Sequence, residues 1–413
     1  MAACALATAR VRDGALITPQ GRRPDLLRIP PEDFFAAAED ALPPNLLEVY
    51  DFNYVRGCAL MALASIQDGR IDHMRKYLGH YFTIMAIRQW HYEANWPAEL
   101  SPVEKEERRR LYWSIYTLDI YTAIVWNGAF HFQEAHSRVE YPRGTTSSQS
   151  SDTDWIIGWN FTTDLYRILE HAVTRLRTRH SKFNLFADGV PSGPINNSAI
   201  LKKVDSLYSA LPPSFKELKP AIGNLDTDIY GFQAANIQAT LALLRMVFLS
   251  LEGDADLEKK CAVASDVLET FHHVPKAFQR AISTPLIYHI ASIGNILGSV
   301  MEGPLSEASY QRVRGVLVSM ASLLESLEDF LSRRAGAGRS LRDLVGAIDG
   351  YMESRRGIGQ DSQVPIRLAG PEVTGIEAGG IDEFSDLFQI PDELLQDWNW
   401  SSMLLSDVQH PLV

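Results

Sequence analysis

Residues 100–128 of the sequence read LSPVEKEERRRLYWSIYTLDIYTAIVWNG, and this stretch decides the fold because it carries the clearest helix start in the chain. Ser101 can cap a helix, Pro102 fits the first helical position, where its missing N–H is not needed, and Glu104 completes a capping box with Ser101. The glycine that closes the stretch is the residue type that most often ends a helix. The stretch therefore predicts a helix over 102–126.

Apolar residues recur at the helical period in other parts of the chain as well. One stripe runs from Phe161 to Leu176 and another from Ile237 to Leu251. Further helices are predicted over 55–66, 71–87, 258–271, 286–300 and 307–331. Sustained strand alternation is hard to find, so the sequence predicts an all-α fold, in which many helices form a bundle or a layered array.

The composition is that of an ordinary globular protein, with 46% hydrophobic and 22% charged residues in a chain of 413. The longest apolar runs fall short of the roughly 20 residues that span a bilayer, so no membrane span is expected. The first residues lack the cationic start of a secretory signal, which predicts an intracellular protein. Three scattered cysteines and loosely spaced histidines give no ligand set, so neither a metal nor a cofactor is predicted.

The net charge of -12 is concentrated at the C-terminal end. From Pro371 onward there are nine acidic residues and no Lys or Arg, so the rest of the chain carries only -3. Non-specific binding to nucleic acid depends mainly on Lys and Arg that neutralise phosphates. The near-neutral part of the chain before Pro371 is therefore not expected to bind DNA by itself.

The acidic residues of the C-terminal region alternate with bulky apolar ones. This composition is typical of disordered activation segments, whose aromatic groups stay exposed until a partner's groove accepts them as a short helix. The predicted division is a flexible segment over 1–30, a helical body over 31–354, a linker over 355–380 and an acidic tail over 381–413. The alternative is that the tail forms a helix docked on the body. The predicted contacts with a coactivator are Leu394, Leu395, Trp398 and Trp400.

Asp119 is the one carboxylate that falls among apolar and aromatic residues of the 102–126 helix. A buried ionised carboxylate needs a partner, and the predicted partner is one of Arg108, Arg109 and Arg110 or an aromatic hydroxyl. A catalytic acid is the alternative. No second carboxylate or nucleophile is placed beside Asp119 by the spacing, so a structural ion pair is favoured and no catalytic residue is predicted.

The stretch from Glu104 to Asp119 resembles the signature of the fungal-specific transcription factor domain, the middle homology region of zinc-cluster regulators. Other segments that resemble the family are Gly79–Phe82, Val139–Pro142, Asn160–Arg167 and Ala235–Thr240. The resemblance implies a helical region that regulates transcription in the nucleus, beside a six-cysteine zinc cluster that binds DNA and an acidic C-terminus that recruits the transcription machinery. Three cysteines cannot build such a cluster.

The resemblance therefore indicates a transcriptional regulator that is not an enzyme and reaches DNA only through a partner or a missing N-terminal domain. A metabolic or secondary-metabolite gene cluster is the expected target, and both a homodimer and a heterodimer fit. Two alternatives remain open. One is an all-helical enzyme that acts on a hydrophobic metabolite, for which Asp254 and Asp256 are the nearest acidic motif. The other is an inhibitory subunit that pairs with a full-length regulator.

Overall fold

The computed structural model describes residues 1–15, 29–126, 128–143, 155–179, 197–250, 257–298, 305–331 and 336–358. These residues contain thirteen α-helices and no named strand, and the only strand-like pairing among them is an isolated bridge between Tyr92 and Arg138. The prediction of an all-α array is confirmed. The acidic tail, with the four predicted coactivator contacts Leu394, Leu395, Trp398 and Trp400, lies outside the described residues, as does most of the predicted linker.

The helices follow one another along the chain with short 3-10 turns between some of them. They are α1 (Ala2–Arg12), α2 (Pro31–Asp40), α3 (Phe52–Gln67), α4 (Ile71–Arg88), α5 (Pro102–Val125), α6 (Trp155–Arg179), α7 (Asn197–Ala210), α8 (Leu225–Ser250), α9 (Leu257–His273), α10 (Lys276–Ile282), α11 (Thr284–Gly298), α12 (Glu307–Glu328) and α13 (Ala337–Ile358). The 3-10 turns include η2 (Leu46–Glu48), η3 (Glu93–Asn95), η4 (Glu134–His136) and η6 (Pro213–Phe215).

The predicted start of α5 is confirmed in detail. The hydroxyl of Ser101 accepts the backbone N–H of Glu104 at 3.3 Å, and the Glu104 carboxylate accepts the backbone N–H of Ser101 at 2.9 Å. Pro102 takes the first helical position. All four donors and acceptors of this box are satisfied locally, which fixes where the signature helix begins.

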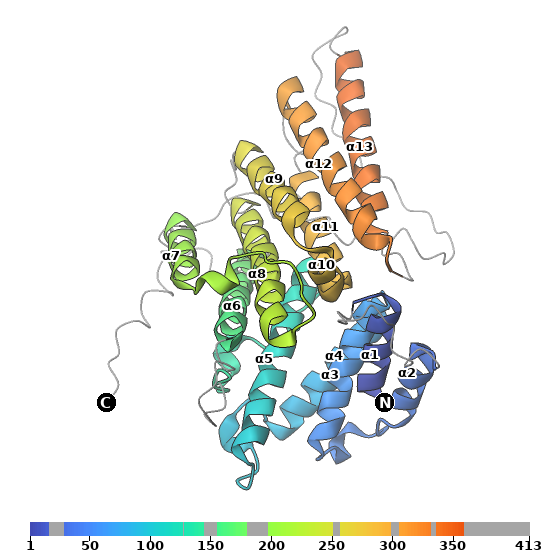
Figure 1. Ribbon diagram of the computed structural model, residues 1–413, viewed down its shortest axis with the longest axis vertical. Helices are drawn as coiled ribbons and strands as arrows, with labels where there is room; N and C mark the ends of the chain where they lie inside the picture. The colour runs from blue at the N-terminus through green and yellow to red at the C-terminus, as the bar shows by residue number, and fades with distance from the viewer. Residues whose placement is uncertain are drawn as a thin grey trace.

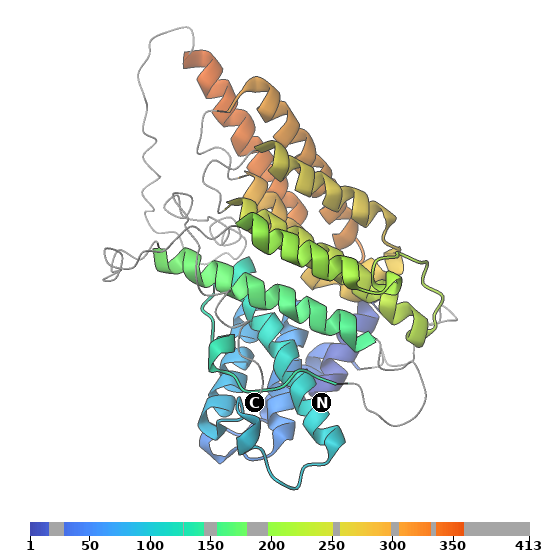
Figure 2. The same cartoon turned by 90° about the vertical axis from the view of Figure 1, so that its left-hand side faces the viewer.

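The helices stack in successive layers along the long axis of the molecule (Figures 1 and 2). The pair α3–α4 and α5 lie at one end, α6 and α8 cross the middle, and α12 and α13 form the other end. Each layer packs on the next, since α5 contacts α6, α6 contacts α8, α8 contacts α9 and α11, and these contact α12. The buried apolar residues form one continuous core through all the layers.

Helix α8 is the centre of this core. Seventeen of its residues are buried, because α6, α9, α10 and α11 all pack on it. By length and composition alone it could cross a membrane, but 78% of its most apolar window is buried inside the protein. An apolar helix in the middle of a layered core has the same composition, which accounts for the one span-like helix among the described residues.

The N-terminal segment differs from its prediction. Residues 1–30 were expected to be flexible, but Ala2–Arg12 form α1. Ala5 and Ala9 are each only 1% exposed and pack in the core, where α1 lies along α3. Small side chains allow this close approach, but they give little apolar periodicity from which the helix could be predicted.

Candidate functional site

Asp119 lies in packed surroundings, as predicted, and is 0% exposed. Its carboxylate binds one residue twice: Oδ2 accepts the backbone N–H of His131 at 2.9 Å, and Oδ1 lies 2.6 Å from the Nδ1 atom of the His131 imidazole. The predicted partners were wrong. Arg110, the nearest of the three arginines, lies nine residues earlier in the same helix, which is about 14 Å along the axis and beyond the reach of its side chain.

The arginines pair instead with glutamates around the start of α5. Arg109 donates Nε and Nη2 to the two oxygens of Glu93 at 2.7 Å each, and Nη2 also lies 2.8 Å from Glu140. Hydrogen bonding to Glu93 raises the pKa of Arg109. Arg110 lies 3.2 Å from Glu106, one turn earlier. The triple arginine is thus a set of structural contacts, and Arg109 joins α5 to η3 and to the segment that follows α5.

Arg108 has a different environment. Its side chain is 8% exposed, and its guanidinium lies 4.0 Å from the centre of the Phe52 ring and 5.0 Å and 5.8 Å from the Trp90 and Trp96 rings. Burial lowers the pKa of this guanidinium. Aromatic faces carry negative charge density, so the three rings stabilise the cation, and Glu104 adds a Coulombic attraction. Arg108 therefore links α5 to the start of α3 and to the end of α4.

Residues 128–143 connect α5 with α6, and we call them the connector. Glu170 of α6, 2% exposed, holds the connector against α5: one of its oxygens accepts the Tyr116 hydroxyl at 2.5 Å and the backbone N–H of Glu134 at 3.0 Å. Burial and the nearby carboxylate raise the pKa of Tyr116. Because buried polar groups are costly unless hydrogen-bonded, these contacts specify one position for the connector.

A second set of contacts lies on the outer side of α6. Glu134 of the connector accepts Arg167 and, at 3.3 Å, His171. The Tyr141 hydroxyl donates to Asp164 at 2.6 Å and accepts Arg167 at 3.0 Å. Together with Glu170, these residues form what we call the clasp, because they fasten the connector to α6.

The clasp perturbs two titratable groups in opposite directions. Burial alone would raise the pKa of Glu134, but the hydrogen bonds from His171 and Arg167 outweigh it and lower that pKa to about 2. The hydrogen bond to Glu134 raises the pKa of His171 against the opposing effect of burial. Both shifts favour the charged pair near neutral pH.

The Asp119–His131 pair resembles the orienting half of a catalytic dyad, but its other contact is apolar. The His131 ring stacks on the Phe82 ring with centroids 4.7 Å apart and an angle of 8°. A dyad acts on a nucleophile or a bound substrate within hydrogen-bond reach of the imidazole. His131 instead contacts a carboxylate and a phenyl ring, and these contacts anchor the connector on α5 and α4.

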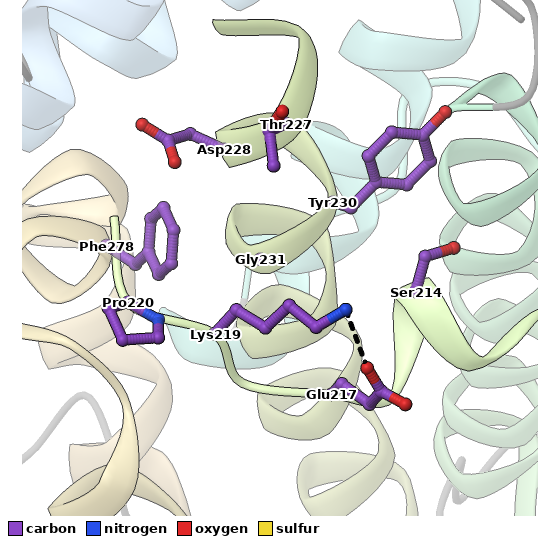
Figure 3. A pocket seen from close by; sticks show the side chains of 9 residues that line it. All are labelled: Ser214, Glu217, Lys219, Pro220, Thr227, Asp228, Tyr230, Gly231 and Phe278. Carbon is purple, nitrogen blue, oxygen red and sulfur yellow. Dashed lines mark ion pairs between the residues drawn. The ribbon is translucent and has the colours of Figure 1, made fainter. Parts of the chain in front are cut away.

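Two cavities in the described part of the chain are small. One has a volume of about 90 Å³ and lies between the η6 loop, α8 and α10. Figure 3 shows Lys219 extended across it and paired with Glu217, with Phe278 on the opposite wall. A second, of about 30 Å³, lies between α8 and α9. Pockets for metabolites usually have about 300–1,000 Å³. No group of His, Cys, Asp and Glu in the described ranges could hold a metal ion.

Sequence reasoning found the buried carboxylate but missed His131, Glu134 and Glu170. The connector has no periodicity that could place His131 or Glu134. The segments that resemble the family did contain part of the clasp, since Tyr141 lies in one of them and Asp164 and Arg167 lie in another. The structure brings these two segments together.

A family model matches the part of the chain that contains these contacts. Residues 30–207 match the family described as the fungal specific transcription factor domain, and this range contains the signature helix, the connector and the clasp. The match ends inside α7, so 208–354 of the predicted body lie beyond it. No curated protein and no solved structure matches the chain. Residues 30–207 are therefore similar to the fungal specific transcription factor domain, a domain of transcription regulators.

Proposed function

We propose that this protein is a nuclear regulator of transcription in which the helical body receives a signal or a partner and the acidic tail contacts the transcription machinery. The observation that carries the proposal is the family match over 30–207, which includes the signature helix α5. In the body, α5 is fixed on both sides, by the aromatic rings around Arg108 and by the clasp. A rigid signature helix suits a regulatory domain that must hold one shape until it is engaged.

The way the protein reaches DNA is part of the same proposal. The sequence contains three cysteines, too few for a six-cysteine zinc cluster, and its body carries a net charge of only -3. Little non-specific affinity for phosphates is expected from such a body. We therefore propose that a DNA-bound partner, or a DNA-binding segment joined to this chain, brings it to promoters. Genes of a metabolic or secondary-metabolite pathway are the proposed targets, following the family resemblance.

The tail supplies the sharpest test. Residues 371–413, fused to an unrelated DNA-binding domain, should activate a reporter gene, because the acidic residues keep the aromatic anchors available to a coactivator groove. Aromatic anchors often contribute about 2 kcal/mol or more each to such interfaces. Replacing Trp398 and Trp400 together with Ala should therefore remove most of the activation, whereas Asp407→Ala, the matched control on the acidic side, should leave it nearly unchanged.

Two results would contradict this assignment. A silent fusion, or full activation by the double tryptophan variant, would show that the tail is not an activation segment. In that case co-expression of the whole chain with a full-length family member becomes the deciding measurement. Repression of that member's reporter would identify an inhibitory subunit.

A further inference from the structure

The turn between α10 and α11 holds a serine in a strained backbone conformation. Ser283 has φ 61° and ψ -140°, a region that residues other than glycine rarely adopt, and it is 1% exposed. Such a conformation costs free energy and persists only where the surroundings hold it. The contacts around Ser283 therefore show what keeps the turn in this state.

The side chain of Gln67, at the end of α3, holds the turn. Its Nε2 donates to the Ser283 hydroxyl at 2.8 Å and to the Asp13 carboxylate at 2.6 Å, while the Thr284 hydroxyl donates to its backbone carbonyl at 3.4 Å. All four residues are at most 4% exposed. Asp13 directly follows α1, so one amide group joins the end of α1 to the strained residue.

Helix α1 makes a second contact with the same turn. Arg10 donates to the backbone carbonyl of Ala281, in the last turn of α10, at 3.2 Å. A cation at the C-terminal end of a helix is favourable because the last carbonyls carry partial negative charge. Arg12 fastens α1 to the end of α3 through Asp68 at 2.7 Å. The position of α10 thus depends on α1 at two points.

Helix α10 carries this dependence to the start of α8. It has seven residues, and its Phe278 lines the cavity of Figure 3 and packs on Gly231 of α8, where an added Cβ atom would lie 2.6 Å from the ring. The Phe278 ring thus occupies the space that a side chain at position 231 would need, which packs α10 closely against the start of α8. In the same region, Ile222 and Leu225 are 65% and 79% exposed.

We propose that the α10–α11 turn is a strained latch, in which docked α1 holds Ser283 in its positive-φ conformation and undocking of α1 releases the turn and α10. A partner that displaces α1 would in this way change the surface formed by the start of α8 and the loop before it. The strain at Ser283 favours the released state, and the contacts of Gln67 and Arg10 favour the held state.

Two substitutions at Ser283 separate strain from hydrogen bonding. Both Ser283→Ala and Ser283→Gly remove the hydroxyl that accepts Gln67, but only glycine relieves the backbone strain. In hydrogen–deuterium exchange of the full chain, Ser283→Ala should speed exchange of residues 276–286 by about tenfold, while Ser283→Gly should leave it near the wild-type rate. Equal exchange in the two variants would show that the turn stores no strain and would overturn the latch.

A second pair of variants tests the coupling to α1. Ala5→Glu places a charge in the buried contact of α1 with α3, and Ala7→Glu makes the same change on an exposed position of the same helix. Ala5→Glu should speed exchange both in α1 and in residues 276–286. In the double variant with Ser283→Gly, the acceleration in residues 276–286 should be much smaller. Ala7→Glu should change neither segment. Faster exchange in α1 alone, or in neither segment with Ala5→Glu, would refute the coupling.

Discussion

Replacing Asp119 with alanine should destabilise the fold through His131. The change removes the acceptor of the His131 backbone N–H at 2.9 Å and the carboxylate oxygen that lies 2.6 Å from the imidazole Nδ1 atom. A hydrogen bond to a charged group contributes about 1.5–3 kcal/mol, and a buried donor left unpaired adds its own desolvation cost. Breaking a fully buried pair costs about 3–5 kcal/mol, but the His131 side chain is 36% exposed, so water can partly replace the lost contact. We therefore expect a loss of about 2–4 kcal/mol.

The assay is urea denaturation of the wild type, of the three single variants Asp119→Ala, Asp119→Asn and His131→Ala, and of the double variant Asp119→Ala/His131→Ala, followed by circular dichroism. Asp119→Asn keeps an acceptor for the backbone N–H in nearly the same volume, so it should cost clearly less than Asp119→Ala. His131→Ala and the double variant complete a double-mutant cycle with Asp119→Ala. If the two side chains act as a pair, the double variant should lose less stability than the sum of the two single losses. An Asp119→Ala protein as stable as the wild type would refute the reasoning, as would Asp119→Asn and Asp119→Ala with equal losses.

Three further predictions follow from the contacts and the composition. Because the folded pKa of His171 is raised, His171 stabilises the fold fully below about pH 6.5, and this contribution is lost as the pH rises through the folded value. The stabilisation from Glu134, whose pKa is lowered, is lost only as the pH falls from about 4.5 toward 2. The stability difference between the wild type and His171→Gln should therefore be greatest near pH 5–6 and remain under about 1 kcal/mol, because His171 is half-exposed; a difference that grows above pH 8 would contradict this. Gly231→Ala should destabilise the fold by about 1–3 kcal/mol because the added Cβ meets Phe278, whereas Gly315→Ala, in open space on α12, should stabilise it by up to about 1 kcal/mol. Melting temperatures that rank the two variants the other way would exclude this packing. The purified chain should contain no stoichiometric zinc and give no sequence-selective footprint on DNA; metal analysis showing two zinc ions per chain would overturn this.

Helices with a regular apolar stripe could be predicted from the sequence, and those built from small residues could not. The predicted ranges 55–66, 71–87 and 258–271 differ from α3, α4 and α9 by at most three residues at either end. Helix α1 was missed because alanines form its buried face. Helix α13 was missed although Leu341, Val345, Ile348 and Met352 form a buried stripe, since four glycines in the same segment lower its helix propensity.

The candidate site shows the same limit for polar contacts. Asp119 could be recognised as buried because its neighbours along one helix are apolar, and that local pattern is visible in the sequence. Its partner His131 lies beyond the end of the helix, where a chain without periodicity can turn in many directions. Glu170 forms its contacts across two other segments, so only the assembled layers reveal them. Local patterns locate a polar residue that needs a partner, but tertiary packing selects the partner.

The borders of the family match do not coincide with a physical border of the protein. A polypeptide cut to 30–207 would end within α7 and would lack both α1 and α8. It would therefore expose the side of α3 that α1 now covers and the side of α6 that α8 now covers. Large uncovered apolar surfaces drive association. The smallest portion that folds as a soluble unit should therefore extend at least from α1 through α8 and the helices that surround it.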